Sequence, residues 1–285
     1  MIDYLTPQQA NILIALSKFK YMTKKHFIAY QIGTKKNGTL HNNLMLLRDK
    51  KLLNRYGFSV TPMIGGRLED IYFLTEKGAK IVAENLDIPL DSIRYPNRST
   101  TEFKNDYNHR VATVSTIISF VLWAENQGYE IDFFDTYYDK VGSQRKSETG
   151  VQSKTRLDLP NQTNISPDAI IKYDGKDKSY LFCIEVYNGK DTKRVVEQLR
   201  KLSYATFEGI PSKKYNHSKG NRNLILFEHE SYIQATIDRI KQDPYLSQFE
   251  GLERFFYFKS IEATKNDFGG SWRDLGGKKR DLSEF

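Results

Sequence analysis

Two apolar segments followed by an amphipathic one, within residues 167–207, constrain the fold more than any other part of the chain. Residues 167–173 and 179–187 are short apolar runs bounded by turn-forming residues, a pattern that predicts buried strands. The link between them is short enough to join neighbouring antiparallel strands. Residues 192–207 place apolar side chains at helical spacing. The segment therefore predicts a β-hairpin followed by a helix that packs on it.

Each of the two predicted strands carries one carboxylate. Asp168 opens the first strand and Glu185 lies near the end of the second, so antiparallel pairing brings the two side chains to the same end. Two carboxylates suit a hard divalent ion that keeps several waters and activates one of them against a phosphodiester. We expect Asp168 and Glu185 to bind Mg²⁺ or Mn²⁺, with the carbonyl of Val186 as a further ligand. The alternative is a turn aspartate and an exposed strand glutamate.

The residue two positions after Glu185 is Tyr187, on the same face of the strand by alternation. PD-(D/E)xK nucleases, which this hairpin resembles, have a water-orienting lysine there. Lys190, Lys193 and Lys201 are nearby amines, and the sequence selects none of them. Tyr187 is alternatively a catalytic nucleophile or an ordinary strand residue.

His109 is a further catalytic candidate, as a general acid or base or as a metal ligand. Its alternative role is to line the start of a helix. The other histidines are widely scattered along the chain, so no three-histidine metal cluster is expected. No glycine-rich phosphate loop followed by Lys and Ser or Thr is present, which gives no support for ATP use.

The excess positive charge of the chain is confined to its N-terminal part. Residues 1–57 contain ten Lys and Arg but only two acidic residues, Asp3 and Asp49, whereas the remaining residues hold 33 of each sign. A local positive field attracts polyanions whatever their sequence. We therefore expect this part to contact nucleic acid, against the alternative of an ordinary solvated lysine-rich surface.

The same region has the element order of a winged helix-turn-helix. Thr6 and Pro7 are typical of a helix start. Further helices are expected over residues 24–31 and 39–53, strands near 54–56 and 70–74, and another helix from residue 75. In this fold the third helix enters the major groove of double-stranded DNA. A winged helix that docks on protein is the alternative.

The expected DNA contacts follow from this placement. The third helix would read bases with Thr39, His41, Asn42 and Asn43, because Asn pairs bidentately with adenine. Phosphates would be held by Lys35, Lys36, Arg55 and Arg67.

The predicted fold class is α+β, with the winged helix followed by an α/β restriction-endonuclease-like domain. The second domain is expected to begin with a helix over residues 102–126 and to follow the order αβββαβ. Residues 139–164 are predicted to be a long, partly mobile loop. The predicted boundaries are 1–86 for the first domain, 87–101 for a linker, 102–262 for the second domain and 263–285 for a flexible tail.

No apolar run approaches the roughly 20 residues of a membrane span, and the N-terminus lacks the pattern of a signal peptide. Cys183 is the single cysteine, so no internal disulfide is possible. These features predict a cytoplasmic protein.

Residues 166–204 resemble the replication-relaxation family of plasmid and mobile-element proteins, which overlaps with MobC-type relaxases. The resemblance rests on Ser166 to Ala169, on Ile184, Glu185 and Val186 followed by Gly189 and Thr192, on Leu199, Lys201, Leu202 and Tyr204, and on Asn108 to Val111. The family commonly has an acidic residue at the position of Tyr187, where this chain departs from it. The resemblance implies origin nicking or replication control on a mobile element, with accessory mobilisation or replication proteins as partners. A non-catalytic replication or transcription regulator is the alternative function.

Overall fold

The computed structural model describes residues 5–34, 38–58, 67–96, 106–142, 150–160 and 162–284. The chain divides into two compact units, Met1–Ser99 and Thr100–Phe285. Both units combine helices and strands, so the predicted α+β class is confirmed. None of the helices in these ranges is long and apolar enough to cross a bilayer.

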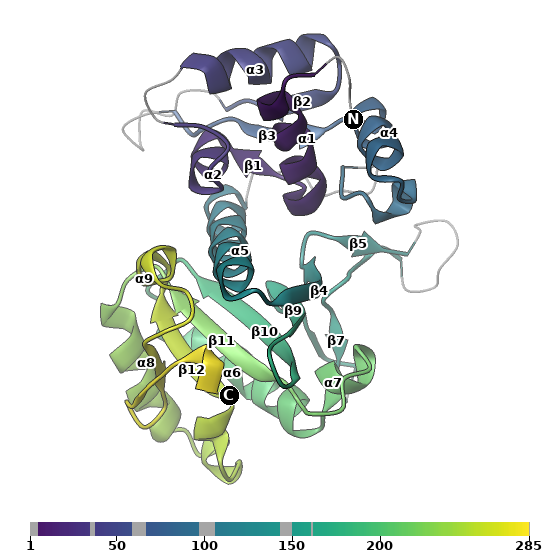
Figure 1. The fold of residues 1–285 in the computed structure, drawn as a ribbon. Helices are drawn as coiled ribbons and strands as arrows, with labels where there is room; N and C mark the ends of the chain where they lie inside the picture. The colour runs from purple at the N-terminus through teal and green to yellow at the C-terminus, as the bar shows by residue number, and fades with distance from the viewer. Residues whose placement is uncertain are drawn as a thin grey trace. The chain divides into compact units, whose positions relative to one another are not determined.

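Unit 1 packs four helices against a small antiparallel sheet (Figure 1). The helices are α1 (Pro7–Phe19), α2 (Lys24–Ala29), α3 (Gly38–Asp49) and α4 (Glu76–Leu86). The strands are β1 (Met22–Thr23), β2 (Leu53–Tyr56) and β3 (Ile71–Leu74), in the spatial order β1-β3-β2.

Threonine side chains start three of these helices. The hydroxyls of Thr6, Thr23 and Thr75 accept hydrogen bonds from backbone N–H groups in the first turns of α1, α2 and α4. Each bond satisfies a donor that has no partner within its helix. The helices then bury leucine and isoleucine stripes, as the spacing predicts: Ile12, Leu13, Leu16, Leu40, Leu44 and Leu47 are fully buried.

The first part of the predicted linker belongs to unit 1. A 3₁₀ turn at Leu90–Ser92 is followed by Ile93, which is buried. Arg94 donates its backbone N–H to the carbonyl of Ser17 at 3.1 Å and its Nη1 to that of Lys18 at 3.2 Å. Residues 88–94 are therefore fastened to α1, and residues 97–101 of the predicted linker lie outside the described residues.

Unit 2 is built on a seven-stranded sheet with the order β14-β13-β12-β11-β10-β9-β4. Strand β11 pairs in parallel with β10 on one side and with β12 on the other, and every other pairing in this sheet is antiparallel. The strands are β4 (Glu130–Thr136), β9 (Ala169–Asp174), β10 (Ser179–Tyr187), β11 (Arg222–Phe227), β12 (Phe256–Ser260), β13 (Trp272–Asp274) and β14 (Lys279–Arg280).

Helices cover both faces of this sheet (Figure 1). On one face, Phe120 of α5 (Tyr107–Gln127) packs on Tyr173 and Phe268. On the other face, α6 (Thr192–Phe207) and α8 (Ser231–Lys241) share a core with alternate residues of β9, β10 and β11, including Ile170 and Cys183. The shorter helices are α7 (Ile210–Lys214), α9 (Ile261–Asn266) and 3₁₀ turns at Leu246–Gln248, Leu252–Arg254 and Leu282–Glu284.

The predicted flexible tail is instead a packed part of the sheet. Strand β13 pairs with β12, and Trp272 is fully buried with its indole N–H donated to the carbonyl of Phe268 at 2.6 Å. Gly269 lies so close to Trp123 that a Cβ would be 2.1 Å from the indole nitrogen. Glycine-rich composition predicted a loop here, but aromatic packing against α5 and the sheet fixes it.

The predicted loop over residues 139–164 also has more order than expected in its described parts. It contains two short hairpins, β5–β6 (Lys140–Val141 with Gln152–Ser153) and β7–β8 (Leu157–Asp158 with Asn164–Ile165). Thr155 is fully buried, and its hydroxyl donates to the carbonyl of Pro167 at 2.6 Å. This bond fixes the segment immediately before Asp168. Residues 143–149 and 161 lie outside the described residues.

An ion pair at the outer side of α6 gives unit 2 a predicted acid sensitivity. Buried Asp243 accepts hydrogen bonds from Arg200 and from the backbone N–H groups of Tyr245 and Leu246. Burial raises the pKa of Asp243, but the Arg200 hydrogen bond and the two backbone bonds outweigh it, so the pKa lies below the ordinary value. A depressed pKa contributes stability that is present above the unfolded pKa and is lost as the pH falls below it.

We therefore expect Asp243→Asn to lower the free energy of unfolding by about 1 kcal/mol at pH 7, because the pair is partly exposed. The difference from wild type should shrink as the pH falls through about 4. Urea unfolding of unit 2 at a series of pH values measures this, with the exposed Glu250→Gln as control. A difference that stays constant with pH would show that the Asp243 charge contributes nothing.

Candidate functional site

The register of β9 and β10 places the two predicted carboxylates side by side. Cys183 pairs with Ile170 and Ile184 with Ala169, so Asp168, immediately before β9, is opposite Glu185. Ile170 and Cys183 both belong to the core beneath α6. By alternation Glu185 lies on that side of the sheet. Asp168 precedes β9, and its carboxylate is reached by His109 of α5, the helix on the opposite face, yet it is close enough to Glu185 for its charge to raise the pKa of Glu185.

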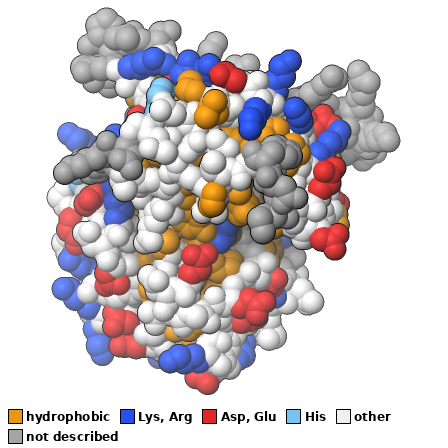
Figure 2. Space-filling view, turned by 45° about the horizontal axis from the view of Figure 1, so that its top comes forward, with side chains coloured by type: hydrophobic (Ala, Val, Ile, Leu, Met, Phe, Trp, Pro, Cys, Tyr) orange, Lys and Arg blue, Asp and Glu red, His pale blue; other side chains and the backbone are white. Residues whose placement is uncertain are grey.

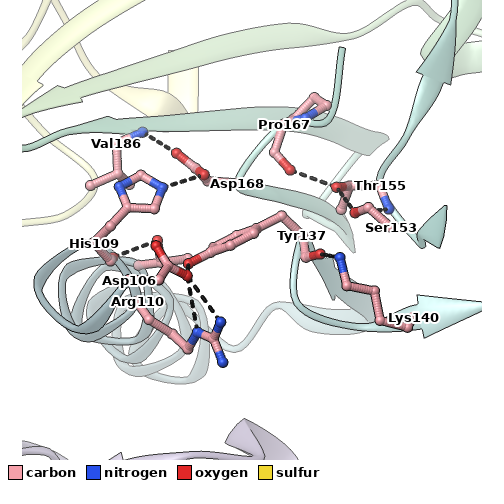
Figure 3. Close-up of polar contacts among 11 residues, drawn as sticks. Asp106, His109, Arg110, Tyr137, Lys140, Ser153, Thr155, Pro167, Asp168 and Val186 are labelled. Atoms are coloured by element: carbon pink, nitrogen blue, oxygen red, sulfur yellow. Dashed lines mark hydrogen bonds and ion pairs between the residues drawn. The ribbon is translucent and has the colours of Figure 1, made fainter. Parts of the chain in front are cut away.

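Asp168 is buried and has a protein hydrogen bond on each of its side-chain oxygens (Figure 3). His109, in the first turn of α5, places Nε2 2.7 Å from Oδ1. The backbone N–H of Val186 donates to Oδ2 at 2.7 Å. The carbonyl of Asp168 accepts from the N–H of Tyr137 at 3.0 Å. Three predicted site residues, His109, Asp168 and Val186, thus meet at one carboxylate.

Glu185 differs from Asp168 because one of its oxygens is left without a partner. The side chain is only 4% exposed, and Oε1 accepts no hydrogen bond from any described residue. Within the same described ranges, the buried hydroxyl of Tyr187 and the side-chain oxygen of Asn188 also lack partners. Buried polar atoms are rarely unsatisfied, and each is costly in free energy. Glu185 Oε1 is the one of the three that belongs to the carboxylate pair.

Burial and mutual repulsion control protonation at this end of β10. Burial first, and the nearby Asp168 carboxylate second, hold the pKa of Glu185 well above its ordinary value. Burial and the same two carboxylates also raise the pKa of the Tyr187 phenol, and the Arg194 guanidinium lowers it only in part. Without a bound cation, both groups therefore favour their neutral forms.

His109 is drawn toward its charged form. Burial lowers the pKa of His109. The charge and hydrogen bond of Asp168, with a smaller contribution from Asp106, raise the pKa by more than burial lowers it, so it lies above the ordinary value. The sequence offered lining of the helix start as its alternative role. Its contact with Asp168 connects it instead to the carboxylate pair.

A second network, which the sequence did not indicate, supports His109 (Figure 3). Arg110 is almost fully buried and donates from Nη2 to Asp106 at 3.0 Å. The Tyr137 hydroxyl donates to the same carboxylate, and its ring lies 5.3 Å from the His109 ring. Asp106 and Arg110 have ordinary helical i,i+4 spacing, and Tyr137 is distant in sequence, so no local pattern marks the three as a group.

The donor set fits a divalent metal only in part. Among the described residues, no group of three or more His, Cys, Asp and Glu side chains is arranged to hold an ion. Asp168 and Glu185 remain as two carboxylates, which matches the way Mg²⁺ uses few protein ligands and keeps its waters. The unpartnered Oε1 of Glu185 is the atom that such an ion would satisfy.

None of the three lysines near Tyr187 in sequence is brought to Glu185 by a described contact. Lys190 and Lys193 are exposed, and Lys201 lines a groove farther along α6. The cation whose charge reaches Tyr187 is Arg194, in the first turn of α6. Its guanidinium forms no ion pair within the described ranges. Sequence reasoning missed it because only lysines were considered.

In unit 1, the predicted base-reading residues divide into two groups. Thr39, His41 and Asn42 are exposed on α3. Asn43 is buried: its side-chain oxygen accepts from Gln9 at 2.8 Å, and its amide donates to Gln8. The prediction that Asn43 reads bases is therefore wrong, because its polar side chain joins α3 to α1.

Two of the predicted phosphate-binding residues already have an anionic partner. Arg55 and Arg67 both pair with Asp70, the latter at 2.6 Å. One carboxylate between two guanidinium groups leaves a reduced positive charge. Lys35 and Lys36 lie outside the described residues. Figure 2 shows Lys and Arg side chains gathered along the upper edge of the view, over unit 1.

Comparisons with known proteins do not assign the chain to a family. No family model matches it, and neither the curated proteins nor the solved structures include a significant match.

Proposed function

We propose that the protein binds double-stranded DNA through unit 1 and nicks it by metal-dependent hydrolysis at Asp168 and Glu185. The observation that carries the proposal is the buried, unpartnered Oε1 of Glu185 beside a second buried carboxylate, a costly arrangement without a cation. The antiparallel hairpin, the covering helix α6 and α5 on the opposite face support a restriction-endonuclease-like unit 2.

Asp168 and Glu185 would hold Mg²⁺ or Mn²⁺, which supplies charge neutralisation at the phosphate and a water of lowered pKa. The N–H and C=O of one residue point to the same side of an extended strand. Because the N–H of Val186 points to Asp168, its carbonyl is directed to that side as well, in line with the predicted third ligand.

Three further side chains would surround the carboxylate pair. His109 fixes the rotamer of Asp168 through the contact between its Nε2 and Oδ1. The Tyr187 hydroxyl lies at the sequence position where PD-(D/E)xK nucleases have an amine, and burial keeps it neutral. Arg194 supplies positive charge for the phosphate oxygens from α6.

Unit 1 supports the DNA-binding half of the proposal. Its element order and the β1-β3-β2 sheet agree with a winged helix-turn-helix, in which α3 would be the recognition helix. The exposed Thr39, His41 and Asn42 are suitably placed on that helix. The resemblance of residues 166–204 to replication-relaxation proteins points to origin DNA of a plasmid or integrative element, and to accessory mobilisation or replication proteins as partners.

The direct test uses supercoiled plasmid that carries the native locus, incubated with the full chain and Mg²⁺ or Mn²⁺. We expect conversion to open circles that requires the metal and is blocked by chelator. A plasmid that stays supercoiled at every metal concentration would refute nicking.

Two neighbouring asparagines in α3 give a matched test of DNA recognition. Asn42→Ala should weaken binding to a duplex selected from a random pool by roughly tenfold or more, without changing stability, because it removes a base contact. Asn43→Ala should lower stability by about 1–3 kcal/mol, because Gln8 and Gln9 lose their buried partner. Anisotropy titration and thermal melting of both variants measure this. Equal losses of affinity at unchanged stability would place Asn43 in the interface.

A non-catalytic regulator is the second candidate function, and two observations favour it. Tyr187 occupies the lysine position, and both oxygens of Asp168 are already hydrogen-bonded within the protein. In that case His109 and Asp168 would be structural partners, and unit 2 would serve as a scaffold.

A further inference from the structure

A groove of about 680 Å³ lies along α6, and none of the carboxylate-site residues lines it. Helix α6 contributes Glu197, Arg200, Lys201 and Tyr204, and Tyr245 lines it from the segment after α8. This volume is in the range of sites that hold small molecules or parts of polymers. Leu159, Pro160 and Thr163 complete the lining, so the groove combines two cations and one carboxylate with two phenol rings and a small apolar wall.

The polar wall of the groove is fixed in place by Asp243. Its carboxylate receives the Nε and Nη2 of Arg200, the latter at 2.6 Å, and the backbone N–H of Tyr245 at 3.1 Å. Asp243 itself is buried. One carboxylate therefore sets the positions of both the Arg200 guanidinium and the Tyr245 backbone before any ligand arrives, which lowers the ordering cost of binding.

Exposed aromatic rings continue from the groove. Tyr245 is 38% exposed, and its ring lies 5.4 Å from that of Phe249. Phe249 is in turn 4.9 Å from Phe207, which is 39% exposed. Phe249 is partly buried, so the two exposed rings flank it on a surface where flat groups can stack.

The chemistry of the groove selects the class of ligand. Lys201 and the outer edge of Arg200 suit phosphates, the phenol rings suit planar bases, and Glu197 offers an acceptor for a base amino group. A free phosphate would leave the rings unused. Bases within a duplex are already stacked on one another, so their faces cannot reach the rings.

We propose that this groove binds a short stretch of single-stranded nucleic acid, with bases on Tyr204 and Tyr245 and phosphate on Lys201. The source of that strand, DNA opened by nicking, rests on the proposed function, but the binding itself does not. The groove would hold the released strand on unit 2 while unit 1 keeps the duplex.

The test measures binding of a fluorescein-labelled twelve-residue oligothymidine to the full chain by anisotropy. Tyr204→Ala and Tyr245→Ala should each weaken binding about tenfold. Tyr204→Phe and Tyr245→Phe should remain within about twofold, since the ring is kept. Lys201→Ala should reduce the slope of log affinity against log salt by about one, whereas the exposed Lys241→Ala, at the end of α8, should not.

Cross-linking locates the contact directly. An oligonucleotide that contains 5-iodouracil should cross-link to Tyr204 or Tyr245 on irradiation, as mapped by mass spectrometry. Cross-links confined to other residues, or wild-type affinity in both alanine variants, would overturn the proposal and leave the aromatic surface to a protein partner. Asp168→Asn should bind the oligonucleotide normally. Wild-type protein that binds the oligonucleotide but does not nick plasmid in Mn²⁺ would refute the proposed nuclease and leave the groove assignment intact.

Discussion

Replacing Asp168 by Asn or Glu185 by Gln is expected to abolish nicking of supercoiled plasmid in Mn²⁺, with a loss of more than about a hundredfold. Loss of a supporting residue around a metal typically costs ten- to hundredfold, and these changes remove the carboxylate ligands themselves. Both substitutions keep the side-chain shape. Duplex binding should be unchanged, because unit 1 is untouched.

Thermal melting gives a readout that is independent of activity. Mn²⁺ should raise the melting temperature of wild-type unit 2, because a ligand that binds only the folded state stabilises it. The increase should disappear in Asp168→Asn and Glu185→Gln. Asp174→Asn is the matched control, since Asp174 is exposed at the other end of β9. If Mn²⁺ does not change the melting temperature of the wild type and no nicking is seen, the non-catalytic regulator becomes the favoured function.

Tyr187→Phe then separates two nicking mechanisms. Burial and the adjacent carboxylates keep the Tyr187 phenol protonated, which makes it a poor nucleophile. We expect the Phe variant to retain most of the activity and the cut DNA to run free of protein on a denaturing gel. A DNA–protein adduct that the Phe variant fails to form would establish a covalent mechanism.

The sequence located the carboxylate pair because the pair depends on local rules. A short hairpin turn and the antiparallel register are enough to bring Asp168 and Glu185 to the same end of the hairpin. The helix after the hairpin was predicted at the bounds it has, Thr192–Phe207, since Asp191 caps a strongly amphipathic run. These elements needed no information about distant parts of the chain.

The predictions from sequence were wrong where a residue distant in sequence determines whether a side chain is buried. Asn43 is on the border of the buried stripe of α3, and its polar type predicted an outward side chain. Gln8 and Gln9 on α1 satisfy it inside, and no local pattern reveals such a pairing. Trp272 likewise follows glycines that predict a loop, yet it is buried in the sheet. The Asp106 and Tyr137 contact joins residues far apart in sequence for the same reason.

Gly78→Ala is expected to produce the largest stability loss in unit 1. Gly78 lies in the first turn of α4, directly over Leu52, and a Cβ there would be 1.9 Å from the Leu52 carbonyl oxygen. That oxygen also accepts from the backbone N–H of Thr75 at 3.1 Å, so α4 cannot move away without breaking its own attachment. Alanine favours helix by about 0.5–1 kcal/mol, whereas overpacking of this kind costs about 3 kcal/mol. The clash therefore dominates.

Gly38→Ala in α3 is the matched control, because no atom of the described part of the chain lies within 4 Å of its added Cβ. It should leave stability unchanged or raise it slightly.

Both tryptophans, Trp123 and Trp272, belong to unit 2, so their fluorescence follows unit 2 alone. Hydrogen exchange in α1 then reports on unit 1. Gly78→Ala should accelerate exchange throughout α1 and leave the tryptophan transition in place, since each unit has its own core. Unchanged protection of α1 would mean that Leu52 yields to the methyl group and that the close approach of α4 is not required.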